Sequence, residues 1–240
     1  MKAFIIGLLI WNVVLPAAAE EALAGLAQAD AAYAKREDVV QAKIALEYYK
    51  RALAEDPQKV EAYWKASRTA WWIGDQSESR ADQLNYFQQG MNFAKQAVTL
   101  DPNSVEGHYW LGGNSGSYGD AKGVMKSLFL IKPIRHEMAE VIRLNDHFDG
   151  GGAYRILGVV DYKVPGIAGG SRKRAKEELE KSLAFDPSSP FIHYYLAEFY
   201  MTGGDKEKAR AEVDVLRSLK VSPELEPELH TLQKRSEKFL

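Results

Sequence analysis

The sequence predicts an all-α fold built from paired helices that repeat along the chain. Polar and apolar residues recur at the helical period, and no segment shows the sustained two-residue alternation of a strand. Asp-Pro pairs end successive helical stretches. Small and aromatic residues recur in one order within those stretches, which favours a stack of similar helix pairs.

Asp-Pro pairs mark the ends of the predicted helices. They occur at Asp56-Pro57, Asp101-Pro102 and Asp186-Pro187, with a weaker Ser222-Pro223 near the C-terminus. Proline cannot continue a helix, because it lacks the N–H group and its ring collides with the preceding turn. Polar residues follow each Asp-Pro pair, as is typical where a new helix begins.

The clearest repeat unit runs from Pro190 to Pro223 and turns at Gly203-Gly204-Asp205. Its two helices carry packing residues typical of tetratricopeptide repeats, namely Leu196, Ala197, Tyr200 and Ala209. An earlier helix has the small–aromatic–small order of this pattern at Ala45, Tyr49 and Ala52. We therefore predict a tetratricopeptide-like solenoid of four to five antiparallel helix pairs with inserted loops.

The repeat spacing is longer than the roughly 34 residues of the standard unit. Pro57 and Pro102 are 45 residues apart, and Pro102 and Pro187 are 85 apart. We expect the extra residues in three loops, at Asp75–Asp82, Gly112–Gly119 and Pro165–Gly170, the second because it is rich in glycine. Functional loops and tolerated surface insertions both remain open.

The N-terminus has the pattern of a secretory signal peptide. An uncharged, mostly apolar run extends from Ala3 to Leu15, and small residues lead to Ala19 in the order of a cleavage site. The run is shorter than the roughly 20 residues that span a bilayer, although an uncleaved anchor is the alternative. We expect a signal peptide at 1–19 and one periplasmic helical domain at 20–240, without stable membrane insertion.

Composition excludes several classes of function. The chain has no cysteine, which removes disulfides, thiolate metal sites, a lipid anchor and cysteine nucleophiles. Lys+Arg of 31 against Asp+Glu of 33 gives a net charge of −2, too balanced for non-specific nucleic-acid binding. No Gly-Lys pair is present for a phosphate loop. We expect no catalytic residues and no cofactor.

The five histidines are dispersed along the sequence, and none forms a His-Glu-x-x-His pair. His136 and Glu140 share a helix face, and His147 lies near Asp146 and Asp149. A weak oxygen and nitrogen metal site is conceivable there. Solvated polar residues are the default interpretation, so no metal is expected.

The central and C-terminal portion, from about Ala42 to Pro223, contains an ordered series of glycine-rich and aromatic segments. They are His108–Gly119, Asn145–Phe148, Gly150–Gly158, Val164–Gly166 and Gly169–Ser171, with Lys173, Ala175 and Leu179 after them. This order resembles the T-component family associated with tripartite ATP-independent periplasmic (TRAP) transporters. The resemblance implies an all-helical protein with a hydrophobic pore or groove that partners a periplasmic substrate-binding protein and that could form a homo-oligomer.

Phasing the helices on the Asp-Pro pairs predicts which side chains face a concave groove. The expected binding residues are Trp64, Arg68, Trp71, Trp72, Tyr109, Asn114, Tyr118, Arg155, Tyr162, Lys163 and Tyr194, with Phe191 beside the last. Aromatic rings beside Arg and Lys can stack an apolar body and neutralise a carboxylate. Two alternatives stay open: Trp71 and Trp72 packed between helices, and Arg155 and Lys163 in ordinary ion pairs.

These observations predict a non-catalytic periplasmic binding protein. It would dock a substrate-binding protein, hold a small amphipathic acid, or do both. The alternative is an envelope scaffold that recognises a peptide segment of a partner protein and binds no small ligand.

Overall fold

The computed structural model describes the backbone of residues 17–240 and the side chains of residues 25–240. The predicted signal peptide at 1–19 lies almost entirely outside these residues, so its cleavage stays a prediction. Within the described part of the chain no strand occurs, which confirms the all-α class. None of the described helices is long and apolar enough to cross a membrane.

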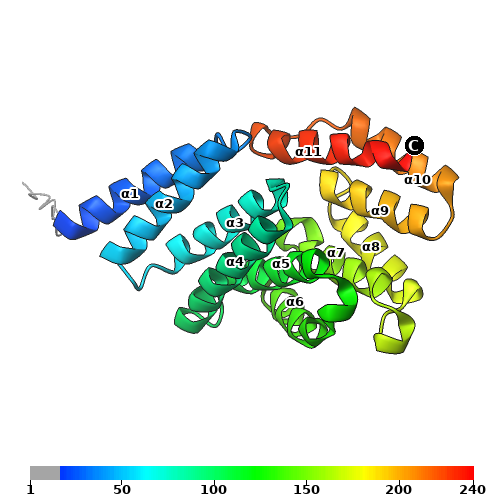
Figure 1. Cartoon of the computed structure of the whole chain (residues 1–240), viewed down its shortest axis with the longest axis horizontal. Helices are drawn as coiled ribbons and strands as arrows, with labels where there is room; N and C mark the ends of the chain where they lie inside the picture. The colour runs from blue at the N-terminus through cyan, green and yellow to red at the C-terminus, as the bar shows by residue number, and fades with distance from the viewer. Residues whose placement is uncertain (1–16) are drawn as a thin grey trace, which may run out of the picture.

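Eleven α-helices and five short 3₁₀ turns make up the described chain (Figure 1). The helices are α1 (Ala17–Tyr33), α2 (Val39–Glu55), α3 (Val60–Gln76), α4 (Arg80–Leu100), α5 (Val105–Lys122), α6 (Ile131–Asn145), α7 (Phe148–Lys163), α8 (Arg172–Phe185), α9 (Pro190–Thr202), α10 (Lys206–Ser218) and α11 (Glu226–Ser236). The 3₁₀ turns are η1 (Val124–Lys126), η2 (Leu128–Leu130), η3 (Gly166–Ala168), η4 (Pro223–Leu225) and η5 (Glu237–Phe239).

The helices form two layers that follow the tetratricopeptide pattern. Each helix packs against the next along the chain, and α3, α5, α7, α9 and α11 also contact one another in succession. These odd-numbered helices therefore form the inner layer of the solenoid. The layer curves until α11 lies beside the turn between α1 and α2, so the chain closes into a ring (Figure 1).

Small residues set the close approach of paired helices, as the sequence predicts. Ala42, Ala45 and Ala62 are fully buried in the first core cluster. Tyr49 is also fully buried, and its hydroxyl donates a hydrogen bond to Asp30 (2.6 Å). A larger side chain at one of these alanines would overpack the core, at a typical cost of about 1–3 kcal/mol.

Each predicted Asp-Pro corner is present and has one geometry. The aspartate N–H donates to the last turn of the preceding helix, for example from Asp56 to the Ala52 carbonyl (2.9 Å). The aspartate side chain accepts an N–H from two residues later, at 3.0 Å from Gln58 and 2.9 Å from Asn103. Aspartate thus satisfies backbone groups on both sides of the break, which explains why it precedes the proline.

Two of these corners also hold a buried histidine six residues after the proline. His108 Nε2 lies 3.0 Å from the Pro102 carbonyl, and its Nδ1 lies 2.6 Å from Glu137. His193 repeats the arrangement with Pro187 (2.9 Å) and Glu212 (2.8 Å). Both ring nitrogens face acceptors, so only the protonated ring satisfies both.

The carboxylates raise the pKa of both rings. The hydrogen bond to Glu137 raises the pKa of His108 against the opposing effect of burial. Burial disfavours the charged form of His193, but the hydrogen bond to Glu212 and the proline carbonyl outweigh it and raise its pKa.

Two of the three predicted loop insertions are wrong. The segment Asp75–Asp82 contains only a short connection, because α3 ends at Gln76 and α4 begins at Arg80. Gly112–Gly119 lies entirely inside α5. Its glycines allow close packing, since a Cβ on Gly112 would lie 2.4 Å from the Met138 side chain. The Pro165–Gly170 loop is present and contains η3.

The backbone leaves the right-handed helical conformation at the start of α7. Asp149, Gly150 and Gly151 have φ angles of 50°, 60° and 73°, in the left-handed region. Side chains there would also collide, because a Cβ on Gly150 would lie 2.6 Å from Asp186. The predicted loop geometry of the triple glycine is therefore confirmed, and it turns the chain from α6 into the inner layer.

The paired histidines predict a pH dependence of stability. A raised folded-state pKa contributes stability below the unfolded pKa of about 6.5 and loses it as pH rises through the folded-state value. The urea midpoint should therefore fall from mildly acidic to mildly alkaline pH, and more steeply in the wild type than in the H108Q/H193Q variant. H136Q, at an exposed site, should keep the wild-type slope. Equal slopes in the wild type and the double variant would contradict this account.

Candidate binding hollow inside the ring

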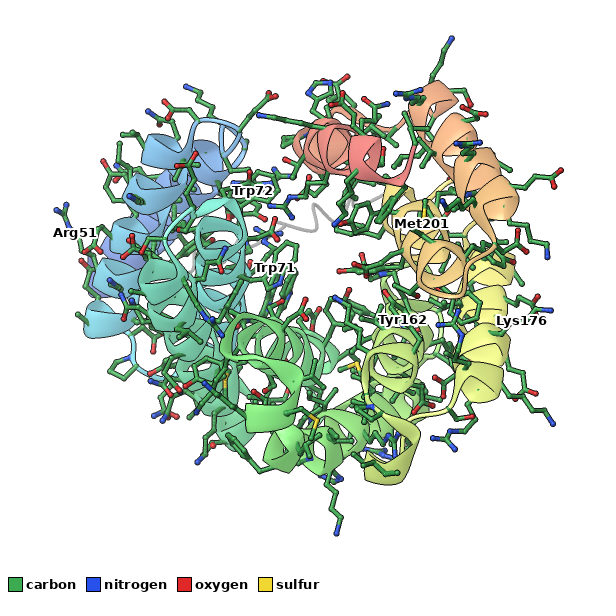
Figure 2. All side chains as sticks on the ribbon, turned by 45° about the vertical axis from the view of Figure 1, so that its right-hand side comes forward. Arg51, Trp71, Trp72, Tyr162, Lys176 and Met201 are labelled. Atoms are coloured by element: carbon green, nitrogen blue, oxygen red, sulfur yellow. The ribbon has the colours of Figure 1, made fainter. Side chains whose placement is uncertain are left out.

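Side chains of the inner helices surround a central hollow (Figure 2). It consists of two connected cavities that share Trp71, Ser117, Phe191, Tyr195 and Glu228 in their walls. The first, here called the aromatic cavity, has a volume of about 720 Å³ and extends over Trp64, Tyr109 and Trp110. The second, here called the acidic cavity, has a volume of about 600 Å³.

The wall of the aromatic cavity is a contiguous set of rings from three helices. Trp71 of α3 lies 5.7 Å from Trp110 of α5 and 6.4 Å from Phe191 of α9. The Trp71 indole N–H donates to Ser117 (2.9 Å), which fixes the ring across the gap between α3 and α5. Trp64, Arg68 and Trp71 follow the i, i+4, i+7 spacing of one helix face, so α3 presents them all to the hollow.

Arg68 places a guanidinium group against this wall. The group lies 3.9 Å from the Tyr33 ring centre and 5.3 Å from that of Trp64. Among the described residues it has no ion pair or hydrogen bond, and its buried Nε has no partner. The neighbouring Lys65, in contrast, is already paired with Asp30 (2.7 Å).

The Arg155 guanidinium is buried, and its charge is already balanced by an ion pair with Asp149. Its Nη2 donates to Asp149 (2.6 Å) and to the Tyr109 hydroxyl (2.7 Å). Burial disfavours the charge of Arg155, but Tyr109 and Asp149 outweigh this effect and raise its pKa. Because burial also raises the pKa of Tyr109 well above its ordinary value, that hydroxyl stays neutral.

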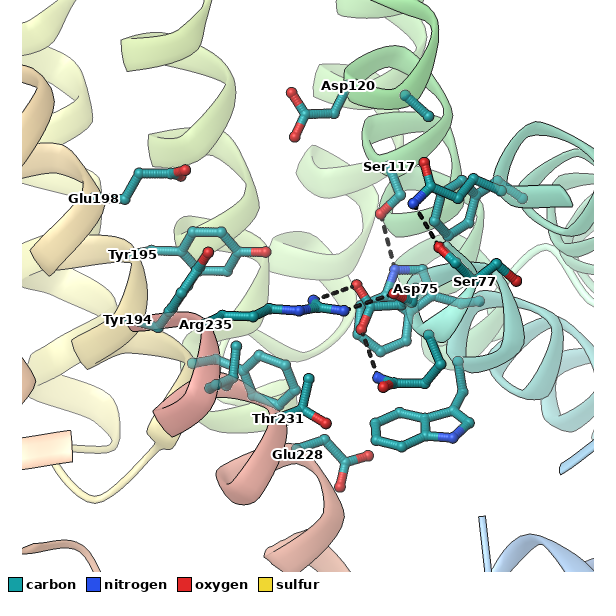
Figure 3. A pocket seen from close by; sticks show the side chains of 18 of the residues that line it. Asp75, Ser77, Ser117, Asp120, Tyr194, Tyr195, Glu198, Glu228, Thr231 and Arg235 are labelled. Atoms are coloured by element: carbon teal, nitrogen blue, oxygen red, sulfur yellow. Dashed lines mark hydrogen bonds and ion pairs between the residues drawn. The ribbon is translucent and has the colours of Figure 1, made fainter. Parts of the chain in front are cut away.

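Tyr195 lies where the cavities meet. Its hydroxyl has no hydrogen-bond partner among residues 25–240, and Figure 3 shows the ring beside Arg235 and Glu198. Burial raises the pKa of Tyr195 to about 12, so it remains a neutral hydrogen-bond donor at physiological pH.

The acidic cavity carries more carboxylates than cations. Glu78, Asp120 and Glu198 are part of its wall. Lys163 is held between two of them, 2.7 Å from Asp120 and 3.5 Å from Glu198. Burial disfavours the lysine charge, but the two carboxylates raise its pKa overall. Lys163 is thus in an ordinary ion pair, which is one of the two alternatives that the sequence left open.

Two ion pairs close the ring around the hollow. Arg36, in the α1–α2 turn, donates from Nε to Glu228 of α11 (3.0 Å), and both side chains are buried. Arg235 of α11 donates to the Asp75 carboxylate (2.8 Å) at the end of α3, as Figure 3 shows. We call these contacts the closing ion pairs. The sequence carries no signal for them, because Arg36 and Glu228 are 192 residues apart.

Trp72 supports the same closure. Its ring is only 2% exposed, and its indole N–H donates to the Arg36 carbonyl (2.7 Å). The Arg36 guanidinium also lies 4.6 Å from the centre of the Tyr33 ring and 5.4 Å from that of Trp72. Trp72 is therefore mainly a structural residue, as the packed alternative predicts, although its edge reaches the acidic cavity.

The structure brings most of the sequence-predicted binding residues to the hollow. In the walls of the two cavities lie Trp64, Arg68, Trp71, Trp72, Tyr109, Arg155, Lys163 and Tyr194. Sequence reasoning missed Trp110, Phe148 and Tyr195. Tyr195 could have been found from Phe191, four residues before it on the same helix face. Ligand binding by any of these residues stays a prediction.

Three predicted residues lie elsewhere. Asn114 is fully buried, bonds Ser67 Oγ (3.0 Å) and packs on Gly90, so it links α3, α4 and α5. Tyr118 packs against the apolar cluster that α5, α6 and α7 share. The Tyr162 hydroxyl donates to Glu198 of α9, and the Tyr162 ring packs edge-on against Phe199 of the same helix. The error at Asn114 followed from placing it in a loop rather than within α5.

The residues of the conceivable metal site are used otherwise. His147 lies edge-on against Phe185, with ring centres 4.4 Å apart. Glu140 accepts a hydrogen bond from Arg143 (2.8 Å), and Asp149 binds Arg155. Within the described part of the chain, no three His, Cys, Asp or Glu residues are grouped so that they could hold a metal ion.

Comparisons with known proteins agree with the fold. A protein-family model described as "Regulator of microtubule dynamics protein 1-3" matches residues 25–176. No curated protein matches the sequence significantly.

Several solved structures share the architecture. A thermophilic TPR protein of Thermus thermophilus is 21% identical and superposes with a TM-score of 0.67, over 91% of this chain and 98% of that one. PilF of Pseudomonas aeruginosa gives 15% identity and a TM-score of 0.54, over 93% and 90%. MamA of Desulfovibrio magneticus gives 14% and 0.50, over 88% and 96%. These likenesses establish a TPR-like helical repeat fold.

Breaking a closing ion pair should be costly. R36A leaves Glu228 buried without its partner, so the free energy of unfolding should fall by about 3–5 kcal/mol in urea titrations. K50A removes an exposed ion pair with Glu47 and should lower the free energy of unfolding by only about 0–1 kcal/mol. Similar losses in both variants would show that the Arg36 pair contributes no more than a surface contact.

Proposed function

The chain belongs to the regulator of microtubule dynamics protein 1-3 family, and we propose that it is a non-catalytic binding protein whose hollow holds a small amphipathic acid. One observation carries the proposal: the guanidinium of Arg68, which has no ion pair or hydrogen bond among residues 25–240, lies in a wall of aromatic rings. The family description names the regulation of microtubule dynamics. The proposal concerns ligand binding in the hollow and does not depend on a role at microtubules.

Arg68 is the best placed cation for an incoming carboxylate. Arg155 and Lys65 in the same cavity already contact carboxylates, so a ligand would have to displace Asp149 or Asp30 to reach them. A carboxylate on Arg68 gains charge-assisted hydrogen bonds without breaking any pair.

The remaining wall suits an apolar body attached to that carboxylate. Trp71, Trp110 and Phe191 offer ring faces and edges for stacking. The Tyr195 hydroxyl can donate one further hydrogen bond. The volume of about 720 Å³ lies in the range of roughly 300–1,000 Å³ that is usual for small-molecule sites.

A peptide segment is the second candidate ligand, and the acidic cavity favours it. The two cavities are continuous past Trp71 and Phe191, and the exposed Glu78 carboxylate has no partner among residues 25–240. A segment with one acidic and one basic residue could place the first on Arg68 and the second in the acidic cavity. This corresponds to the envelope scaffold that the sequence allows.

The proposed location is the periplasm, supported by the signal-peptide pattern at 1–19. A periplasmic substrate-binding protein is the partner that the T-component resemblance implies. The matching family is a different one, so this partner stays a prediction.

Export is tested by N-terminal analysis of the protein recovered from a periplasmic extract. Cleavage should leave Glu20 as the first residue, because the small side chains before it fit the signal peptidase. Recovery of the chain with Met1 intact in the membrane fraction would instead support the uncleaved anchor.

The ligand proposal is tested by titrating a series of phenylalkanoic acids and their neutral amides while recording tryptophan fluorescence. The acids should bind more tightly, and R68Q should weaken them by about 10- to 100-fold, because a charged hydrogen bond contributes about 1.5–3 kcal/mol. R51Q, on the outer helix α2, is the matched control and should bind like the wild type.

Equal binding of acids and amides, or full binding by R68Q, would overturn the assignment of Arg68. The E78Q variant separates the two candidates. It should leave small acids unaffected, whereas a peptide that spans both cavities should be weakened by E78Q and R68Q alike.

A further inference from the structure

Two connections between helices expose large apolar side chains to solvent. Met125 and Phe129, in the α5–α6 connection, are each 62% exposed, and Ile167 in the α7–α8 connection is 97% exposed. Single exposed apolar side chains are common, whereas several gathered in one place mark a site of contact with a protein or a membrane. None of the three lines either cavity of the hollow.

The two connections lie at the same end of the helix stack. Helices α5 and α7 contact each other in the inner layer, and Asp120 in the last turn of α5 pairs with Lys163 at the end of α7 (2.7 Å), so the two helices end on the same side. Val124 of the first connection and Ala168 of the second pack against one apolar cluster. Arg135 at the start of α6 also donates to the Gly169 carbonyl (3.0 Å) and so joins the connections.

Both connections are basic, although the whole chain is nearly neutral. Residues 121–136 contain four Lys or Arg and no Asp or Glu, and residues 162–176 contain five and none. Part of this charge is neutralised from within, since Arg135 and Arg174 both bind the buried Asp161. Lys163 turns toward the hollow.

Three lysines in or beside the first connection have no carboxylate partner among the described residues. Lys126 and Lys132 are exposed, and neither has an ion pair among the described residues. The ammonium of Lys122 lies over the rings of Tyr118 and Phe129, at 5.2 and 5.4 Å from their centres. These lysines thus lie in the same segment as Met125 and Phe129. We call this set, Met125, Phe129 and Ile167 with Lys122, Lys126 and Lys132, the loop-tip patch.

We propose that the loop-tip patch adsorbs the protein onto an anionic membrane surface. Met125, Phe129 and Ile167 enter the interfacial layer, and the lysines lie among the lipid phosphates. This is peripheral contact by side chains, and none of the described helices crosses the bilayer.

The shape of the patch favours a lipid surface over an acidic protein. Ile167 projects from a short 3₁₀ turn and is almost fully exposed. A protein partner would need a matching pocket for each separated tip, whereas the interfacial layer of a bilayer deforms around them. The positive charge of the lysines in the loop-tip patch complements anionic lipid headgroups.

The absence of cysteine from the chain makes a direct test possible. In the full chain, I167C carries a polarity-sensitive fluorophore, and V40C carries the same label as a control at a 60% exposed apolar residue of α2. Vesicles of phosphatidylcholine, alone or mixed with phosphatidylglycerol, are added at low and high salt. Because both labelled chains share the apolar run at 3–15, its own contact with lipid cannot mimic a difference between them.

The I167C label should shift to an apolar environment with the anionic vesicles, less so at high salt, while the V40C label stays unchanged. Introducing K126E/K132E into the labelled I167C chain should lower its affinity for anionic vesicles by about tenfold or more, since each lysine near such a surface contributes about fivefold in affinity. Equal responses at both labels, no response to anionic vesicles, or a response to polyglutamate in place of vesicles would overturn the proposal.

Discussion

The buried ion pair between Arg36 and Glu228 is the contact on which the shape of this molecule depends. A helical solenoid has no intrinsic reason to end where it begins, and its two ends are joined here mainly by long charged side chains. Desolvating such a pair is expensive, and removing one partner is costlier still, so the contact defines one arrangement rather than adding much net stability. Closure turns an open concave surface into a hollow that helices surround like a ring.

Within that hollow the charges are largely satisfied by one another. Arg155 and Lys163 each contact a carboxylate of the chain itself, and this keeps their positions fixed. Arg68 differs because aromatic rings, rather than carboxylates, surround its guanidinium group. Among the described residues, the aromatic cavity therefore combines a wall of rings with a guanidinium group that has no ion pair. The loop-tip patch gives the outer surface a separate character at one end of the stack.

Much of the fold and most of the predicted site residues follow from the sequence because they depend on local rules. The Asp-Pro corners need only neighbouring residues, and the helical period places Trp64, Arg68 and Trp71 on one face. Glycine disfavours helices locally, so the sequence predicts a loop at Gly112–Gly119. Close packing of Gly112 against Met138 instead keeps this segment helical. The wrong loop prediction also made Asn114 a candidate binding residue, although it is buried and hydrogen-bonded to Ser67. The Arg36–Glu228 contact joins the two ends of the chain, so no local pattern could reveal it.

Ring closure in solution can be measured directly, because the cysteine-free chain accepts spin labels at chosen positions. Labels at K43C on α2 and K234C on α11 lie at exposed sites on opposite sides of the closing ion pairs. Double electron–electron resonance should give one narrow distance distribution, which broadens and shifts to longer distances when E228A is added. A distribution that is already broad without E228A, or one that E228A leaves unchanged, would contradict a ring held closed by Arg36 and Glu228.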